Sequence, residues 1–296
     1  MSVRERVQKI SQNMNLNINT PLTTAKIELT GCCTLGCWFC DHLNMKKNNI
    51  RQHMMSQEDF EIVLEYLKRF DSLREVGLFY MGESGLHPLL DRYYRRLKKA
   101  GYFTFLTTNA TVITNTLKAI PYIDSLKVSW NYKNENDFNH NFSLGIEQYN
   151  TIIENIKILK TECNKFGKPL AISTVLDTRK EDYTDSLSKL VYDEHYWIPL
   201  QNQGGTQECG ADGVIGEDSH KVSPLPCWSL FKGVYIDCDL NVRLCCYGHS
   251  NKHILGNLHN GIDSIKSKDD IKLKQLSMKV PSPCMHCLRQ TTGNKK

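Results

Sequence analysis

The sequence lacks any apolar run approaching the roughly 20 residues that a membrane-spanning helix needs, which argues against an integral membrane protein. Its first segment, MSVRERVQKISQNMN, also lacks the apolar stretch of a secretory signal peptide. Nor does one charge dominate, because the net charge is only +5 over 296 residues, and a duplex-DNA binder is usually more basic. We therefore expect a cytoplasmic protein without a membrane partner, and we disfavour nucleic acid as a partner.

Cysteine, in contrast, is abundant. The chain has 12 cysteines, and because the cytoplasm keeps thiols reduced, disulfide bonds are not the natural explanation for them. Metal binding or thiol chemistry accounts better for this number, and the spacing of the cysteines has to distinguish the two.

Segments typical of strands and helices alternate along the first two thirds of the chain. Strands are predicted at Thr24–Thr30, Val76–Met81, Tyr102–Leu106, Leu126–Trp130, Leu170–Leu176 and Tyr196–Leu200. Helices are predicted at Glu58–Phe70, His87–Ala100, Ile146–Thr161 and Tyr183–Tyr192. Ser56 can cap the first of these helices, and Gly101 can end the second.

This alternation predicts an α/β fold with a parallel sheet, either an open doubly wound sheet or a partial barrel. In both folds, ligands gather at the carboxyl ends of the strands. Residues 206–226 are rich in glycine, serine, aspartate and proline, which is typical of a linker. We place a boundary near Gln207, which gives an N-terminal extension (1–23), a core domain (24–206) and a linker with a small cysteine-rich domain (207–296). In the latter, Tyr235–Leu244 predicts a β-hairpin that turns at Asp239–Asn241.

Three cysteines lie in one short loop directly after the first predicted strand. Cys33, Cys37 and Cys40 are spaced CxxxCxxC, and Gly36 gives the backbone freedom to wrap around a bound group. Thiolates are the usual ligands of iron–sulfur clusters, and three of them leave one iron of a [4Fe–4S] cluster without a protein ligand. That iron can hold a substrate or cofactor. The alternative is a zinc knuckle or a set of buried structural thiols.

This loop, with the aromatic Phe39 before its last cysteine, resembles the signature of the radical SAM superfamily. The resemblance implies a partial (β/α)6 barrel and a cluster whose open iron binds S-adenosylmethionine. It further implies one-electron cleavage of that cofactor to a 5′-deoxyadenosyl radical, which removes a hydrogen atom from the substrate. A flavodoxin- or ferredoxin-type protein is the implied electron donor.

Further segments resemble cofactor-contacting motifs of the same family, in the same order along the chain. Tyr80-Met81-Gly82-Glu83 is similar to the GGE motif, with Met81 in place of the first glycine. A carboxylate such as that of Glu83 can hold the ammonium group of the cofactor by charge-assisted hydrogen bonds.

Two further segments resemble motifs of the family. Thr107-Thr108-Asn109 is similar to the TN(G) turn, with Ala110 where glycine is common, and Ser129-Trp130-Asn131 is similar to an S-x-D segment. The implied cofactor-binding residues are Phe39, Gly82, Glu83, Asn109, Ser129, Asn131, Ser173 and Gln201. The alternative is ordinary strand-end capping and, for Glu83, an exposed surface position.

A second group of cysteines lies near the C-terminus. Its order along the chain resembles the Twitch form of the SPASM/Twitch auxiliary domains, which implies a second, auxiliary [4Fe–4S] cluster held by Cys227, Cys245, Cys284 and Cys287. Cys246 could replace Cys245. Four thiolates ending in CxxC also fit structural zinc, and the spacing does not separate the two metals.

The resulting hypothesis is a radical SAM oxidoreductase that oxidises a small sugar or aminocyclitol, with the auxiliary cluster as electron acceptor. Cys209 is a candidate hydrogen-atom donor, and Arg179, Lys180 or His195 could serve as the base. One alternative is a maturase that epimerises or cross-links a ribosomally made peptide, although the first 20 residues are short for a peptide-recognition domain. An alternative of another class is a non-enzymatic module with two structural zinc sites.

Overall fold

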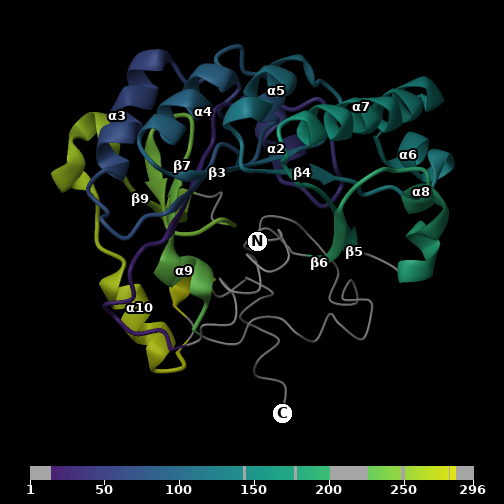
Figure 1. The fold of residues 1–296 in the computed structure, drawn as a ribbon. Coiled ribbons are helices and arrows are strands. Elements are labelled where there is room, and N and C mark those ends of the chain that lie inside the picture. Colours follow the sequence, from purple (N-terminus) through teal and green to yellow (C-terminus); the bar gives the residue numbers. More distant parts are fainter. Residues whose placement is uncertain are drawn as a thin grey trace.

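The computed structural model describes residues 15–142, 145–176, 179–200, 226–247, 251–279 and 281–284. These residues form a mixed α/β fold (Figure 1). None of the helices in this part of the chain is both long enough and apolar enough to cross a membrane.

The strands of the described residues make one sheet in the order β6-β5-β4-β3-β2-β1-β7-β8-β9. Their bounds are β1 (Thr24–Ile27), β2 (Glu75–Gly77), β3 (Phe103–Thr108), β4 (Ser125–Ser129), β5 (Leu170–Leu176), β6 (Glu194–Pro199), β7 (Gly233–Ile236), β8 (Asn241–Arg243) and β9 (Ile254–Asn257). Strands β1 to β6 pair in parallel, and β7 also joins β1 in parallel. Strands β8 and β9 continue as an antiparallel edge, and β7 and β8 form the predicted hairpin.

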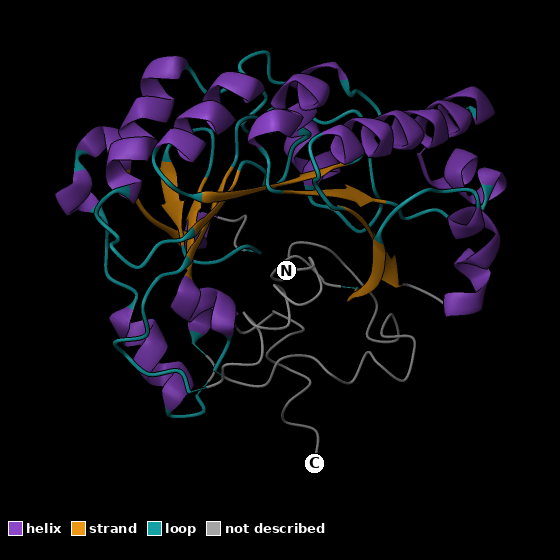
Figure 2. Ribbon diagram, in the orientation of Figure 1, coloured by secondary structure: helices purple, strands orange, loops and turns teal. Residues whose placement is uncertain are grey.

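The helices lie mainly on one side of the sheet. Their bounds are α2 (His42–Lys47), α3 (Gln57–Leu67), α4 (Leu90–Lys99), α5 (Thr114–Ala119), α6 (Glu135–Phe142), α7 (Ile146–Lys165), α8 (Thr184–Ser188), α9 (Trp228–Lys232) and α10 (Asp269–Leu276). Figure 2 shows the sheet curving like an arch, with α3, α4, α5 and α7 along its outer side. This arrangement confirms the predicted partial barrel, because a doubly wound sheet would carry helices on both faces.

Local signals explain why several elements begin and end where they do. The Ser56 hydroxyl accepts a hydrogen bond from the Asp59 backbone N–H at 3.0 Å and caps α3, as predicted. Gly101 follows α4 with φ of +86°, a conformation that favours glycine at a helix end. Strand β2 is shorter than predicted, because the chain leaves the sheet after Gly77 and approaches the loop that follows β1. The Glu83 backbone N–H then donates to the Cys32 carbonyl at 2.8 Å.

A buried aromatic group packs the end of β4 against α6 and α7. The Trp130 and Tyr132 rings lie 4.7 Å apart, and Tyr132 meets Phe138 at the same centroid distance. Tyr149 of α7 contacts all three. Such pairs contribute about 0.5–1.5 kcal/mol each beyond burial, so they hold the carboxyl end of β4 in place.

Candidate active site

The loop after β1 is fixed at its base by backbone contacts. The Thr30 hydroxyl accepts a hydrogen bond from the Cys32 N–H at 3.0 Å and donates to the His53 carbonyl at 2.7 Å. Gly31 donates to the Arg51 carbonyl at 3.0 Å, and a side chain at Gly31 would collide with that carbonyl. A side chain at Gly82 would likewise collide with the Thr30 carbonyl. The loop is therefore held against the strand ends on both sides.

This loop carries the first cysteine region, which comprises Cys33, Cys37 and Cys40. Burial raises the pKa of Cys33 to about 12, with further contributions from the charges of Glu83 and Cys40. Burial also raises the pKa of Cys37 well above its usual value, and the charges of Cys40 and Cys33 add to the shift. The pKa of Cys40 rises to about 11, chiefly through burial. The three thiols resist ionisation because they are buried and because thiolates at this spacing would repel one another. A positively charged metal centre would attract all three thiolates and therefore suits this region.

Glu83 lies behind this region rather than on the protein surface. Its carboxylate accepts hydrogen bonds from the Thr108 hydroxyl and the Gly85 N–H, both at 2.8 Å, and from the Asn109 N–H at 2.7 Å. Only 3% of the residue is exposed, and burial raises the pKa of the carboxyl despite these donors. A carboxylate has about four lone-pair sites, so these three bonds leave room for about one more donor.

Asn109 connects the carboxylate of Glu83 to the cysteines. Its side-chain amide donates to Cys33 Sγ at 3.5 Å and to the Thr34 hydroxyl at 3.1 Å. The next residue, Ala110, is fully buried and has φ of +58°, which explains why this turn favours glycine. The carboxyl ends of β2 and β3 thus converge on Cys33.

Strands β4 and β5 bring two predicted serines side by side. Ser129 pairs with Ser173 in the sheet register, on the face opposite to the core residue Ile172. The buried Ser173 hydroxyl has no hydrogen-bond partner within the described part of the chain. Asn131 uses its side-chain oxygen to accept the Val175 N–H at 2.8 Å. The unsatisfied hydroxyl is suited to a polar ligand group at this end of the sheet.

Tyr132 is a neighbour of the first cysteine region that the sequence did not indicate. Burial raises the pKa of its hydroxyl well above the usual value, and the charges of Cys37, Cys33 and Glu83 add to the shift. No motif marks this tyrosine, and only the packing of Trp130 and Phe138 brings it there. Phe39, which was predicted, is half-buried, and its ring meets the Trp38 ring edge-on at 5.6 Å.

The second cysteine region comprises Cys227, Cys245, Cys246 and Cys284. Burial raises the pKa of Cys245 well above its usual value, followed by the charges of Cys246, Cys227 and Cys284. The buried Gln275 of α10 joins two of the four: its side-chain oxygen accepts the Cys227 N–H at 2.8 Å, and its amide donates to Cys284 Sγ at 3.5 Å. Three of the four predicted cysteines, Cys227, Cys245 and Cys284, therefore converge, with Cys246 beside them.

One side chain links the two regions directly. Tyr80, which precedes the Met81-Gly82-Glu83 segment, donates its hydroxyl hydrogen to the Cys245 carbonyl at 2.9 Å. Because Glu83 in turn bonds to the Cys32 carbonyl, the second cysteine region is tied to the first through one short segment after β2.

Other predicted residues lie elsewhere. Arg179 is exposed, with 78% of its side chain accessible, and pairs with Asp182 at 3.2 Å. His195 pairs with Ile172 in the sheet register, so it lies on the opposite face from Ser173 and bonds to the Thr174 hydroxyl at 3.0 Å. Lys180 is exposed. Gln201, Cys209, Cys287 and the boundary near Gln207 lie outside the described residues.

Comparisons with known proteins agree with this geometry. Residues 27–187 match the family model of the radical SAM superfamily. No curated protein matches the chain significantly in sequence.

Solved structures with similar folds include BtrN, SuiB and anSMEcpe. BtrN in complex with AdoMet and 2-DOIA has a TM-score of 0.56 and 12% identity, covering 90% of this chain and 93% of that chain. Streptococcus suis SuiB bound to the precursor peptide SuiA has a TM-score of 0.59 and 14% identity, with coverage of 95% and 69%. Polyhistidine-tagged anSMEcpe with bound AdoMet has a TM-score of 0.62 and 13% identity, with coverage of 88% and 81%. Since the family match spans more than half of the sequence, the chain belongs to the radical SAM superfamily.

Proposed function

We propose that Cys33, Cys37 and Cys40 hold a [4Fe–4S] cluster at which the protein cleaves S-adenosylmethionine. The observation that supports this most is the placement of three thiols in one loop at the carboxyl ends of β1 to β3, where ionisation of one opposes ionisation of the others. Membership of the superfamily implies a [4Fe–4S] cluster and S-adenosylmethionine. When bound, these groups supply a 5′-deoxyadenosyl radical that abstracts a hydrogen atom from the substrate.

The residues around the loop would position the cofactor. Glu83 holds the Asn109 backbone, and its remaining lone-pair site suits the ammonium group of S-adenosylmethionine. Gly82 packs against the Thr30 carbonyl, so the backbone groups of Gly82 also lie beside the cysteine loop. The unsatisfied hydroxyl of Ser173, with Ser129 beside it, suits the ribose hydroxyls. Phe39, Asn131 and Gln201 complete the proposed cofactor site.

We further propose that the second cysteine region holds an auxiliary [4Fe–4S] cluster in a Twitch-like domain. Cys227, Cys245 and Cys284 supply three ligands, and Cys287 or Cys246 supplies the fourth. The convergence of the first three thiols supports this assignment. Structural zinc is the competing occupant, because it accepts the same donor set.

The proposed reaction is a two-electron oxidation of a small sugar or aminocyclitol alcohol to a ketone. The alcohol would lose a hydrogen atom to the 5′-deoxyadenosyl radical, then one electron to a cluster held by the second cysteine region and its hydroxyl proton to a base or to solvent. A separate electron from a flavodoxin- or ferredoxin-type protein, in the cytoplasm, would start the cleavage of S-adenosylmethionine. The similarity to BtrN, solved with AdoMet and 2-DOIA, supports a small substrate, because it covers 93% of that chain. The similarity to SuiB, solved with a precursor peptide, supports a peptide substrate as the second candidate.

The direct test is anaerobic reconstitution with iron, sulfide, reductant and S-adenosylmethionine. We expect a brown protein with roughly eight irons per chain and formation of 5′-deoxyadenosine. Replacing Cys33, Cys37 and Cys40 together by alanine should abolish this product. Cys163→Ala is the matched control, because Cys163 is a buried cysteine of α7 that belongs to neither region.

Two outcomes would contradict the proposal. A colourless protein with two zinc ions would indicate the structural zinc module, and 5′-deoxyadenosine from the triple variant would place the chemistry elsewhere. To choose between substrates, deuterated sugar alcohols and deuterated peptides can be compared for deuterium transfer into 5′-deoxyadenosine.

A further inference from the structure

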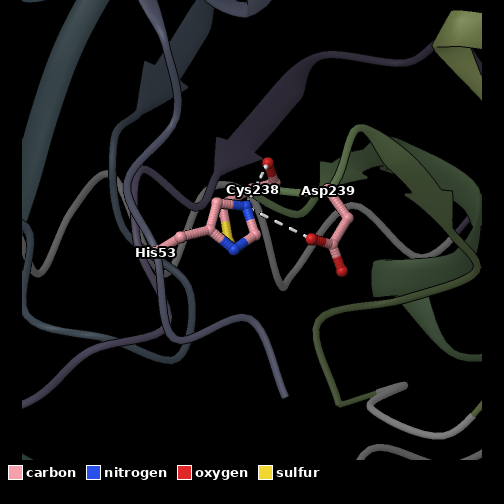
Figure 3. Close-up of side chains that lie close together, drawn as sticks. All are labelled: His53, Cys238 and Asp239. Atoms are coloured by element: carbon pink, nitrogen blue, oxygen red, sulfur yellow. Dashed lines mark hydrogen bonds and ion pairs between the residues drawn. The ribbon is translucent and has the colours of Figure 1, made fainter. Parts of the chain in front are cut away.

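His53, Cys238 and Asp239 come together outside both cysteine regions (Figure 3). Each offers one metal-ligand atom, and these atoms all lie within 4.8 Å of one another. His53 comes from the segment between α2 and α3, whereas Cys238 and Asp239 come from the turn between β7 and β8. Segments far apart in the sequence therefore present an imidazole, a thiol and a carboxylate to the same point.

The backbone on the histidine side is held by the residues that follow β1. The Thr30 hydroxyl donates to the His53 carbonyl at 2.7 Å, and Thr30 forms an isolated antiparallel bridge with Met54. The Met55 N–H donates to the Leu29 carbonyl at 2.7 Å. A bound ion would thus meet an imidazole whose backbone is already fixed.

The backbone on the hairpin side is fixed as well. Asp237 Oδ1 accepts the Asp239 N–H at 3.1 Å and the Asn241 N–H at 2.9 Å. The residue between them, Leu240, has φ of +64°, which the tight turn requires. Only side-chain rotations would therefore be needed to close the three donors around an ion.

The spacing of two of the donors suits a tetrahedral ion. His53 Nε2 lies 3.3 Å from Asp239 Oδ1, and the Cys238 sulfur lies within 4.8 Å of both. Ligands of tetrahedral zinc, at bond lengths near 2.0–2.3 Å, lie about 3.3–3.8 Å from one another. Figure 3 shows the His53 imidazole facing the Asp239 carboxylate, with the Cys238 sulfur overlapping the ring in this view, and the three ligand atoms lie within 4.8 Å of one another.

The surrounding charges also favour a cation. The thiol of Cys238 lies 3.5 Å from Glu28 Oε1, and Asp237 is buried nearby in ion pairs with Arg51 and Arg243. With Asp239, three carboxylates face two guanidinium groups, and burial raises the pKa of Glu28 to about 7, so a negative charge remains as Glu28 ionises. A divalent ion bound to one thiolate adds one positive charge, which balances this excess.

We propose that His53, Cys238 and Asp239 bind one zinc ion that joins the segment after α2 to the β7–β8 hairpin. Nitrogen, sulfur and oxygen donors together suit zinc better than calcium or magnesium. Cys238 releases its proton to solvent when the ion binds. The side chains of His53 and Asp239 are 51% and 42% exposed, so a water molecule can occupy the fourth position. This site does not depend on the clusters proposed above.

The first test is zinc X-ray absorption on the cluster-loaded protein after addition of one equivalent of ZnCl2 and gel filtration. We expect about one zinc per chain, with one sulfur near 2.3 Å and nitrogen or oxygen ligands near 2.0 Å. A zinc surrounded by three or four sulfur atoms would place the ion in a cysteine region and overturn the proposal.

The second test uses His53→Gln and a matched control. His259 forms the same kind of pair with Asp59, also at 3.3 Å, but within the described residues no cysteine joins it to make a three-ligand group. His53→Gln should reduce retained zinc by at least about fivefold, because a three-ligand site loses one donor, while His259→Gln should retain it. Cys238→Ser should lose zinc as well, and the zinc-induced rise in Tm should vanish with it. Full zinc retention in His53→Gln, with the wild-type ligand set, would overturn the proposal.

Discussion

In the first cysteine region, Asn109 Nδ2 lies 3.5 Å from Cys33 Sγ, and in the second, Gln275 Nε2 lies at the same distance from Cys284 Sγ. Each region therefore has a side-chain amide that donates to a sulfur atom. The charges around them differ. Glu83 faces the first region and raises the pKa of Cys33, after burial itself. Lys268 faces the second, where burial lowers its pKa to about 8 and the charges of Cys245 and Cys246 oppose that shift.

This difference bears on the direction of electron transfer. A nearby negative charge stabilises the oxidised state of a metal cluster and lowers its reduction potential, whereas a nearby cation raises it. Clusters bound in the two regions should therefore differ in reduction potential, and the cluster of the second region should be the easier to reduce. That order supports the proposal that the second region accepts an electron from the substrate.

Gly82→Ala should produce the largest effect and separate the two regions. The added methyl group would collide with the Thr30 carbonyl and lie 2.6 Å from the Cys32 carbonyl, so the cysteine loop would have to move. We expect loss of about half of the iron and of all 5′-deoxyadenosine formation, with the second region still loaded. Gly145→Ala is the control, because nothing lies within 4 Å of a methyl group there. Full iron content in Gly82→Ala would show that this contact does not shape the first region.

Gln275→Ala should affect the second region alone. It removes the acceptor for the Cys227 N–H and the donor to Cys284, at a cost of about 2–3 kcal/mol. We expect faster loss of iron to a chelator from that region, with unchanged S-adenosylmethionine cleavage. Asn109→Ala should show the reverse pattern. Equal effects of the two variants on both regions would mean that the regions are not independent.

Lys268→Met tests the electrostatic difference. The Lys268 ammonium donates to the Gly233 carbonyl at 2.8 Å, and its charge interacts with Cys245 and Cys246. Loss of the Lys268 charge should lower the reduction potential of a cluster in the second region by tens of millivolts. A unit charge about 8 Å away contributes on the order of 2 kcal/mol at an effective dielectric constant of about 20. Potentiometric titration followed by electron paramagnetic resonance measures this shift. Lys274→Met, on the exposed side of α10, should leave the potential unchanged.

The smallest expected effect compares two residues with positive φ. Met278 follows α10 with φ of +57° and is 61% exposed, so Met278→Gly should stabilise the protein by about 0.5–1 kcal/mol. Ala110 has nearly the same φ but is fully buried, and the loss of its packed methyl group should offset the relief of strain in Ala110→Gly. Urea denaturation of both variants tests this contrast, and a larger gain from Ala110→Gly would contradict it.

Local patterns made the parallel sheet and the first cysteine region predictable. Ser56 and Gly101 marked helix ends, and three cysteines in one loop after a strand needed no knowledge of distant contacts. The environment of Glu83 was not predictable, because two of its three donors, Thr108 and Asn109, come from the carboxyl end of β3, which reaches Glu83 through the pairing of β2 with β3.

Contacts across the sheet account for what the sequence could not reveal. His53 lies beside Cys238 because β7 pairs with β1, and no spacing in the chain announces that pairing. Tyr132 reaches the cysteines through aromatic packing alone. In the second region, the choice between Cys245 and Cys246 stayed open in the sequence because the two are adjacent, and both thiols do lie there.

The proposed chemistry depends on an iron in the first cysteine region that no thiolate of the protein binds. The most direct measurement is electron–nuclear double resonance on the reduced protein, with S-adenosylmethionine carrying oxygen-17 in its carboxylate and with Cys227, Cys245 and Cys284 replaced by alanine. We predict oxygen-17 hyperfine coupling to the cluster of the first region. A reduced cluster without such coupling, or a first region filled by zinc, would contradict this chemistry.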